Sequence, residues 1–291
     1  LTRSAYYDNL TSFTAENLVR IINPLSSDLN VMRQTLLFGG LETIQHNTNR
    51  QRPDLRLFEA GNVYSFQGEK GKRNPLDKYH EEFHLALFVT GRKHEPNWVS
   101  DGKSSGFYEL KAHLEQVLKR MGLDVNRMDK GSVAGNSDLF TDGLVYRSGN
   151  LDIAEITLVK PAVLKKFDIK NDVFFAVIRW QNLVKCRGDH QVRYTELPHF
   201  PEVRRDLALL LDKSLTFDKI KELAFRIENK LLTRVDLFDV YEGEQVGSGK
   251  KSYAVSFILQ DLQATLTDEK IDRTMKKLME AYTKELGAAI R

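Results

Sequence analysis

The sequence has little cysteine, no long apolar run and almost no net charge. Its one cysteine, Cys186, excludes an internal disulfide framework and a four-cysteine zinc site, and it is typical of a reducing compartment such as the cytoplasm. The longest apolar stretches, at 173–178 and 207–211, fall far short of the roughly 20 residues that a membrane span needs. With 43 lysines and arginines against 40 aspartates and glutamates, the net charge of +3 does not by itself indicate a nucleic-acid partner.

The sequence also lacks a signal peptide and internal repeats. No basic segment followed by an apolar segment opens it, which indicates no secretory signal, and no motif recurs at the spacing of a solenoid repeat. Because the first residue is Leu1 rather than methionine, we expect the sequence to be a piece of a longer protein. Its 291 residues, 41% hydrophobic and 29% charged, are typical of a globular protein with two domains of about 150 residues each.

Two prolines mark the predicted boundary between the domains. Pro198 and Pro201 lie three residues apart, and each favours extended backbone in the residue before it, as in a linker. We therefore predict one domain at residues 1–193 and a second at residues 198–291. The slight positive excess lies in the first part, since residues 198–291 contain 16 basic and 16 acidic side chains.

The first part is predicted to be a mainly antiparallel sheet with flanking helices. β-branched and aromatic residues indicate strands at 55–66, 83–90, 151–159 and 173–180. Apolar residues at helical spacing indicate a helix over 29–44, with Ser27 as its expected N-cap, and another over 107–121, which Gly122 ends. Because helices and strands do not alternate strictly, an antiparallel sheet is favoured over a doubly wound parallel one.

The second part has the order β-α-β-β-α-β, which is the ferredoxin-like arrangement. We expect strands at 206–211, 235–241 and 251–260, and a short closing strand within 287–291. One helix is expected to follow an N-cap at Thr216, and the other to begin at Thr267.

Residues 80–84 read His-Glu-Glu-Phe-His and match the H-E-x-x-H pattern of zinc peptidases. That chemistry needs a helix, on which both histidines face the metal and the first glutamate acts as the base. Here the motif runs directly into an apolar strand, and on a strand His80, Glu82 and His84 share one face while Glu81 points away. A zinc hydrolase is therefore the weaker alternative, and an exposed polar strand entrance is the favoured interpretation.

Two further features are predicted to carry no chemistry. Cys186 and His190 resemble a nucleophilic dyad, but no third group orients them, so a lone thiol near a loop is the favoured interpretation. Gly247-Ser248-Gly249 is too short to hold a phosphate and is predicted to be a hairpin loop between two strands.

The ferredoxin-like part offers the sharper candidate site. Both of its helices are expected to cover one face of the sheet and to leave the other face free. We assign the more apolar row of each strand to the helix side, and strict alternation then fixes the rest. The residues assigned to the helix side are Leu207, Leu209, Leu211, Phe238, Val240, Tyr253, Val255 and Phe257. Leu237 is among the residues that alternation places outward.

The open face then presents Ala208, Asp239, Tyr241 and Ser252. A tyrosine ring can stack on an unpaired base, and a carboxylate can accept hydrogen bonds from the donor edge of guanine or cytosine. The small neighbours leave room for the base. These residue types favour single-stranded RNA as the ligand, with a merely solvated face as the alternative.

Particular stretches of the sequence resemble a known family. The run His-Phe-Pro-Glu-Val-Arg-Arg-Asp-Leu-Ala at 199–208 resembles the opening of the ferredoxin-fold anticodon-binding domain, which closes the β subunit of bacterial phenylalanyl-tRNA synthetase. Residues 237–243 and 250–252 continue that resemblance. Upstream, the stretches that resemble the catalytic-like domain of the same subunit are 23–27, 32–33, 36–37, 54–61 and 107–111.

The resemblance implies an α+β fold: a class II synthetase-like antiparallel sheet with flanking helices, followed by a ferredoxin-like βαββαβ domain. In this family the class II-like core of the β subunit has no catalytic activity, and the active site lies on the α subunit. The sequence agrees, because Arg56-Leu57-Phe58-Glu59 is not the arginine-x-glutamate triplet of an active core, and residues 130–197 lack the glycine-rich stretch that ends in an ATP-binding arginine. No activity and no catalytic residue are therefore expected of this chain alone.

The resemblance also implies partners and site residues. The expected partners are the α subunit, in an α2β2 assembly, and tRNA(Phe), with no membrane; ATP and magnesium belong to the holoenzyme, and no cofactor or metal is expected in this chain. The helix at 29–44 is expected to lie against the equivalent α-subunit helix. Transferred position by position, the anticodon site falls on Ala208, Asp239, Tyr241, Ser252 and Arg291. A stand-alone RNA-binding protein with a dead synthetase core is the remaining alternative.

Overall fold

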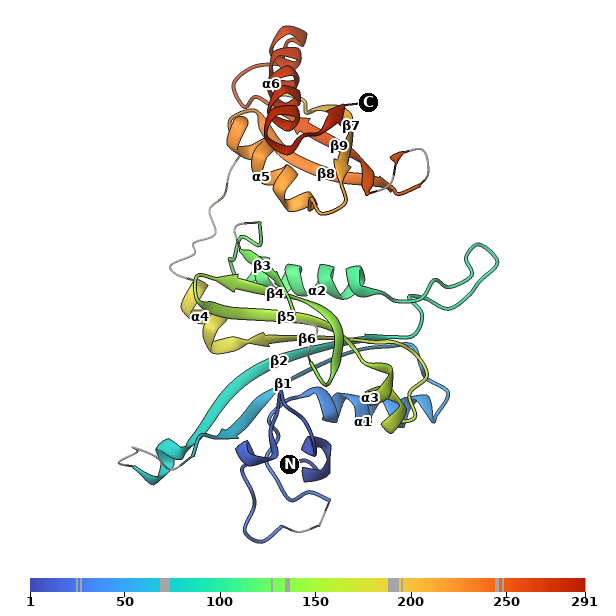
Figure 1. The fold of residues 1–291 in the computed structure, drawn as a ribbon, viewed down its shortest axis with the longest axis vertical. Coiled ribbons are helices and arrows are strands. Elements are labelled where there is room, and N and C mark those ends of the chain that lie inside the picture. Colours follow the sequence, from blue (N-terminus) through green and yellow to red (C-terminus); the bar gives the residue numbers. More distant parts are fainter. Residues whose placement is uncertain are drawn as a thin grey trace. The chain divides into compact units, whose positions relative to one another are not determined.

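The computed structural model divides the chain into two compact units, Leu1–Val192 and Arg193–Arg291, whose elements are labelled in Figure 1. The structure describes residues 1–24, 26, 28–68, 74–126, 128–133, 137–187, 194, 196–243, 246–247 and 249–290. Four residues that the sequence singles out, Ser27, His190, Ser248 and Arg291, lie outside the described residues.

The first unit is built on a six-stranded sheet with the strand order β1-β2-β6-β5-β4-β3. Every pair of neighbouring strands is antiparallel, which confirms the predicted sheet type. Two strands have the predicted bounds, while β3 and β4 were not predicted. The strands are β1 (Leu55–Phe66), β2 (Tyr79–Thr90), β3 (Asp129–Ser132), β4 (Phe140–Ser148), β5 (Leu151–Val159) and β6 (Val173–Arg179).

Helices cover both faces of this sheet (Figure 1). On β2, Ala86 and Phe88 pack with α1 (Leu37–Thr48), whereas Leu87 and Val89 pack with α2 (Phe107–Arg120) and α4 (Trp180–Arg187) on the opposite face. A strand that is buried on both sides is apolar without alternation, which explains the continuous apolar run after residue 84. The remaining helices are α3 (Pro161–Lys166) and the 3-10 turns η1 (Ser4–Tyr7), η2 (Ala15–Asn17) and η3 (Pro75–Lys78).

The predicted helix over 29–44 is wrong in its first half. The segment before α1 is extended, and Val31 forms antiparallel bridges with both Thr2 and Arg20. The backbone amide of Thr2 donates to the carbonyl oxygen of Val31 over 2.9 Å. This long-range pairing outweighs the helical spacing of the apolar residues, so the helix begins only at Leu37 and runs on to Thr48.

Two adjacent glycines in α1 differ sharply in their surroundings. A Cβ atom on Gly40 would overlap the buried ring of Phe88, whereas a Cβ atom on Gly39 would meet only Glu59 Oε2, at 3.8 Å. We expect Gly40→Ala to lower the free energy of unfolding by about 1–3 kcal/mol through overpacking. Gly39→Ala should leave it unchanged or raise it by up to about 1 kcal/mol, since alanine suits a helix better than glycine.

Urea unfolding of the two alanine variants beside the unaltered chain measures this difference. Gly39→Ala is the matched control, because it makes the same chemical change one residue away. Equal midpoints for the two variants would contradict the close packing of α1 against Phe88.

The second unit has the ferredoxin-like order that the sequence predicts. Its four-stranded antiparallel sheet has the order β10-β7-β9-β8. The elements are β7 (Val203–Asp212), α5 (Phe217–Ile227), β8 (Leu232–Tyr241), β9 (Lys250–Leu259), α6 (Asp268–Leu286) and β10 (Ala289–Ile290). Thr216 and Thr267 occupy the N-cap positions of the two helices, as predicted, although neither side chain makes a capping hydrogen bond.

Both described helices of this unit pack on one face of its sheet (Figure 1). Ile220 of α5 and Leu278 of α6 are fully buried against Leu209, Val255 and Phe257, which point inward as predicted. The opposite face is left without a covering helix among the described residues. No helix in the described part of the chain is both long and apolar enough to cross a membrane.

Candidate nucleic-acid interface

Strand register lines up the predicted site residues on the open face of the second sheet. Ala208 pairs with Ala254, and Ala254 pairs on its other side with Asp239. Ser252 likewise pairs with Leu210 on β7 and with Tyr241 on β8. Residues that are directly paired across antiparallel strands share a face, and Ser252 and Ala254 alternate with the buried Tyr253 and Val255. The register therefore brings Ala208, Asp239, Tyr241 and Ser252 together on the face away from the helices.

Tyr241 and Asp239, the two largest members of this group, face solvent in defined positions. Tyr241 is 42% exposed, and a Cβ atom added to Gly243 would lie 2.6 Å from its Cζ, so the ring rests directly against the glycine backbone. Asp239 is exposed, and its Oδ1 accepts a hydrogen bond of 2.9 Å from the backbone amide of Val240. The open face thus exposes the ring of Tyr241 and the carboxylate of Asp239 next to the small residues Ala208 and Ser252.

A bulge in β8 corrects two of the assignments made by strict alternation. Leu237 pairs with Val255 and Asp239 pairs with the next residue, Ala254, so Phe238 has no partner on β9. Leu237 packs against the helix-side core rather than pointing outward. Phe238, which alternation placed inward, is 53% exposed. A bulge adds one residue to a strand, and the side-chain alternation shifts at that point.

The other end of the open face is charged, which the sequence reasoning missed. On β7, Nε and Nη2 of Arg204 donate to the carboxylate of Asp206 over 2.8 and 3.1 Å. On β8, Nε of Arg234 donates to Asp236 over 2.7 Å. The hydrogen-bonded carboxylate of Asp206 raises the pKa of the Arg204 guanidinium. Opposite charges two residues apart on each strand were the signal that could have revealed these pairs.

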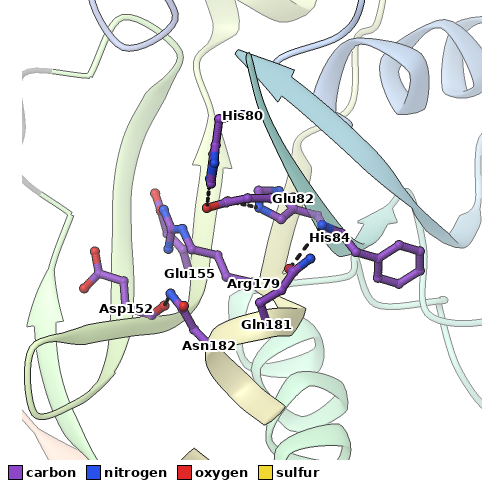
Figure 2. A network of polar contacts seen from close by, with 9 residues as sticks. His80, Glu82, His84, Asp152, Glu155, Arg179, Gln181 and Asn182 are labelled. Carbon is purple, nitrogen blue, oxygen red and sulfur yellow. Dashed lines mark hydrogen bonds and ion pairs between the residues drawn. The ribbon is translucent and has the colours of Figure 1, made fainter. Parts of the chain in front are cut away.

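In the first unit, the His-Glu-Glu-Phe-His motif forms a polar network on β2, shown in Figure 2. Glu82 lies between the histidines, with Oε1 2.8 Å from His80 Nε2 and Oε2 2.9 Å from His84 Nε2. Glu81 instead accepts from the side chain of Asn62. The motif lies on a strand as predicted, and the glutamate that a zinc peptidase needs as its base is not the one beside the histidines. The zinc hydrolase alternative is therefore contradicted.

Burial and hydrogen bonds shift the pKa values of two groups in this network. Burial alone would raise the pKa of Glu82, but its hydrogen bonds to His80 and His84 hold that pKa below its usual value. Burial lowers the pKa of His84, although Glu82 opposes the effect. Beside them, Nη2 of Arg179 lies 3.6 Å from Oε2 of Glu155 (Figure 2). Since Arg179 contacts a carboxylate and burial favours the neutral form of His84, the network does not offer a cluster of free positive groups for a triphosphate.

Arg56 and Glu59 lie on opposite faces of β1. Arg56 pairs with Val89 and donates from Nε and Nη2 to Oε1 of Glu109 on α2, over 3.0 and 2.8 Å. Glu59 pairs with Ala86 on the α1 face and forms an ion pair with Arg33. An arginine-x-glutamate triplet would place both side chains on one face. The spacing of three residues therefore places Arg56 and Glu59 on different faces. Each already has a partner, which is Glu109 for Arg56 and Arg33 for Glu59.

The remaining candidates stay unsupported as sites. Cys186 is partly buried, and its predicted neighbour His190 lies outside the described residues. Gly247 and Gly249 lie between β8 and β9, as expected of a hairpin loop. Over the described ranges, histidines, cysteines and carboxylates form no group of three or more that could hold a metal ion.

Comparison with known proteins agrees with this geometry. Residues 1–180 match the family model described as "Phenylalanyl tRNA synthetase beta chain CLM domain". The chain belongs to the phenylalanyl-tRNA synthetase β-chain family. Residues 198–291 match the model described as "Ferredoxin-fold anticodon binding domain". The resemblance inferred from sequence motifs, and the α+β fold class with a ferredoxin-like second part, are thereby confirmed.

Curated relatives carry the corresponding name. The phenylalanine–tRNA ligase β subunit of Bacteroides thetaiotaomicron is 47% identical over 295 residues, which cover 100% of this chain and 36% of that protein. The β subunits of Porphyromonas gingivalis and Geobacillus kaustophilus are 41% and 30% identical, covering 100% and 98% of this chain and 36% and 34% of their own lengths. This chain therefore spans about a third of the length of these relatives.

Among solved structures, a pyrrolysyl-tRNA synthetase of Desulfitobacterium hafniense matches with a TM-score of 0.45 and 16% identity, over 64% of this chain and 59% of that one.

Proposed function

We propose that residues 198–291 bind the anticodon of tRNA(Phe) through the open face of the sheet formed by β7, β8, β9 and β10. The contact residues are Ala208, Asp239, Tyr241, Ser252 and, at the end of the sequence, Arg291. The observation that carries the proposal is the register of β7, β9 and β8, which places small residues beside an exposed tyrosine and an exposed carboxylate. The family assignment of this part as an anticodon-binding domain supports the same ligand.

The chemistry of these groups fits a guanine base. The ring of Tyr241 stacks on the base, and the carboxylate of Asp239 accepts from the two neighbouring donors on the guanine Watson–Crick edge, N1–H and N2–H. Ala208 and Ser252 leave the space above the sheet open, and the Ser252 hydroxyl can donate or accept. The anticodon of tRNA(Phe) contains one guanine followed by two adenines, so this pocket reads its first base.

Residues 1–193 form, in this proposal, a non-catalytic class II core-like domain that scaffolds the catalytic α subunit in a cytoplasmic α2β2 enzyme. ATP and magnesium act on the α subunit. The separation of Arg56 from Glu59 across β1 supports catalytic silence. The apolar residues of α1 are buried in the chain's own core. A contact between α1 and the α subunit therefore involves the exposed polar side chains of Glu42, Thr43 and His46.

Catalytic silence predicts that this chain alone does not form phenylalanyl-adenylate. An ATP–pyrophosphate exchange assay with phenylalanine should give the rate of the buffer blank, while the complete two-subunit enzyme in the same assay is active. Electrostatic stabilisation of the transferring phosphate needs free cations, and the arginines described above are paired with carboxylates. Exchange that stays proportional to this chain through successive purification steps would contradict the proposal.

The anticodon proposal is tested by titrating the chain with a labelled anticodon stem-loop of tRNA(Phe). A second stem-loop keeps the stem and replaces the three anticodon bases by uridine. We expect the native loop to bind at least about fivefold more tightly, because each specific base contact contributes about 1–3 kcal/mol. Equal affinities for the two loops would show that this face does not read the anticodon.

A further inference from the structure

The bulge in β8 turns a second aromatic ring onto the open face. Phe238 lies between Leu237 and Asp239, which pair with the consecutive residues Val255 and Ala254, so it is the inserted residue. Its side chain is 53% exposed, and the guanidinium carbon of Arg204 lies 5.1 Å from the centre of its ring. Arg204 pairs with Ile258, whose neighbour Phe257 points to the helices, so Arg204 and Phe238 meet on the open face.

The guanidinium of Arg204 is fixed by Asp206 and lies against the ring of Phe238. The carboxylate of Asp206 accepts two hydrogen bonds from Arg204, one from Nε over 2.8 Å and one from Nη2 over 3.1 Å. Nη1 of Arg204 has no hydrogen-bond partner in the described part of the chain, and the side chain is 56% exposed, so the two N–H groups of that nitrogen are available to a ligand. A guanidinium that is fixed by a carboxylate and lies against a ring loses little side-chain freedom when it binds a phosphate.

The spacing separates this pair from Tyr241. Phe238 and Tyr241 are three residues apart on one strand, a rise of about 10 Å, and rings spaced in this way suit two neighbouring bases better than the two faces of one base. Four-stranded sheets of this type bind RNA by stacking successive bases on two or three side chains of one face. Bulges recur next to binding sites because they re-aim a side chain. The two rings therefore suit two neighbouring nucleotides.

We propose that Phe238 and Arg204 form a second base-stacking subsite, which receives an anticodon adenine next to the guanine held by Asp239 and Tyr241. The adenine lies against the exposed side of the Phe238 ring, and Nη1 of Arg204 donates to its phosphate. This inference rests on the proposed anticodon function, and it adds two residues and a second nucleotide to that site.

The test combines protein variants with abasic RNA. Anticodon stem-loops are made with each anticodon nucleotide in turn lacking its base, and each is titrated with the unaltered chain, Phe238→Leu and Phe238→Tyr. Leucine keeps an apolar side chain of similar size, so folding is preserved, but it offers no ring. We expect Phe238→Leu to bind the native loop about fivefold to 100-fold more weakly, and Phe238→Tyr to bind it normally.

The decisive result is the pattern across the loops. Removing one adenine base should weaken binding by the unaltered chain but have no further effect on Phe238→Leu, whereas removing the guanine base should weaken binding by both proteins. Arg204→Gln should weaken binding and make it less sensitive to salt, as the loss of a phosphate contact requires.

If Phe238→Leu binds all loops like the unaltered chain while Tyr241→Ala does not, the second subsite is refuted and the anticodon proposal stands. If the unaltered chain does not distinguish the native loop from the abasic ones, the anticodon proposal fails and the subsite fails with it.

Discussion

Replacing Tyr241 by alanine is expected to weaken binding of the tRNA(Phe) anticodon stem-loop by about 1–3 kcal/mol, the usual contribution of one stacked base. The ring is 42% exposed and rests against Gly243, so it is presented to solvent without packing into the core. Its removal therefore deletes a stacking surface and leaves the fold intact. Titration of a labelled stem-loop measures the loss, and the urea midpoint of the variant reports on folding.

The matched control is Tyr253→Phe. Tyr253 is next to Ser252 on β9 and pairs with Val240 on β8. It is nevertheless 8% exposed and packs among the helix-side core residues. Removing its hydroxyl should leave RNA affinity within about twofold, because a core residue on the other face touches no RNA. Equal losses in Tyr241→Ala and Tyr253→Phe would mean that the open face is not the RNA site.

Asp239→Asn is expected to relax discrimination at the anticodon guanine by about 1–3 kcal/mol. The carboxylate accepts from both N1–H and N2–H of guanine, whereas the asparagine amide offers one acceptor and one donor, so it satisfies one guanine donor and opposes the other. Affinity for the native stem-loop should fall, and affinity for a loop with adenine in place of guanine should change little.

Asp236→Asn provides the control for this change. Asp236 is on the same strand and the same face, but its carboxylate is bonded to Arg234 at 2.7 Å. The substitution removes one negative charge from the face, just as Asp239→Asn does. If both variants change guanine discrimination equally, the effect is one of net charge rather than of a specific contact.

The regular elements of this protein were largely predictable because their signals are local. β1 and β5 have the predicted bounds, and the βαββαβ order follows from alternating apolar patterns and from threonines at helix starts. Turn residues and periodicity act over a few positions, so the sequence alone suffices there. The predicted open-face position of Asp239 and Tyr241 also agrees with the register.

Two features escaped prediction because they depend on distant residues. The segment before Leu37 has apolar residues at helical spacing, yet Val31 is held extended by Thr2 and Arg20. In β8, alternation holds from Arg234 to Leu237 and from Asp239 to Tyr241, but not across the bulge at Phe238. Counting from Val240 gives the right face for Asp239 and Tyr241, while counting from the buried Val235 would have placed both wrongly.

A double-mutant cycle that joins Asp239 to the anticodon guanine is the most direct test of the anticodon site. The unaltered chain and Asp239→Asn are each titrated with two stem-loops, the native one and one with inosine in place of guanine. Inosine differs from guanosine only in lacking the N2 amino group. A hydrogen bond between the carboxylate and that amino group predicts a coupling of about 1 kcal/mol or more, so that inosine weakens binding at least about fivefold more in the unaltered chain than in the variant. An inosine effect that is the same in both proteins would contradict the assignment of Asp239 and of the open face as the anticodon site.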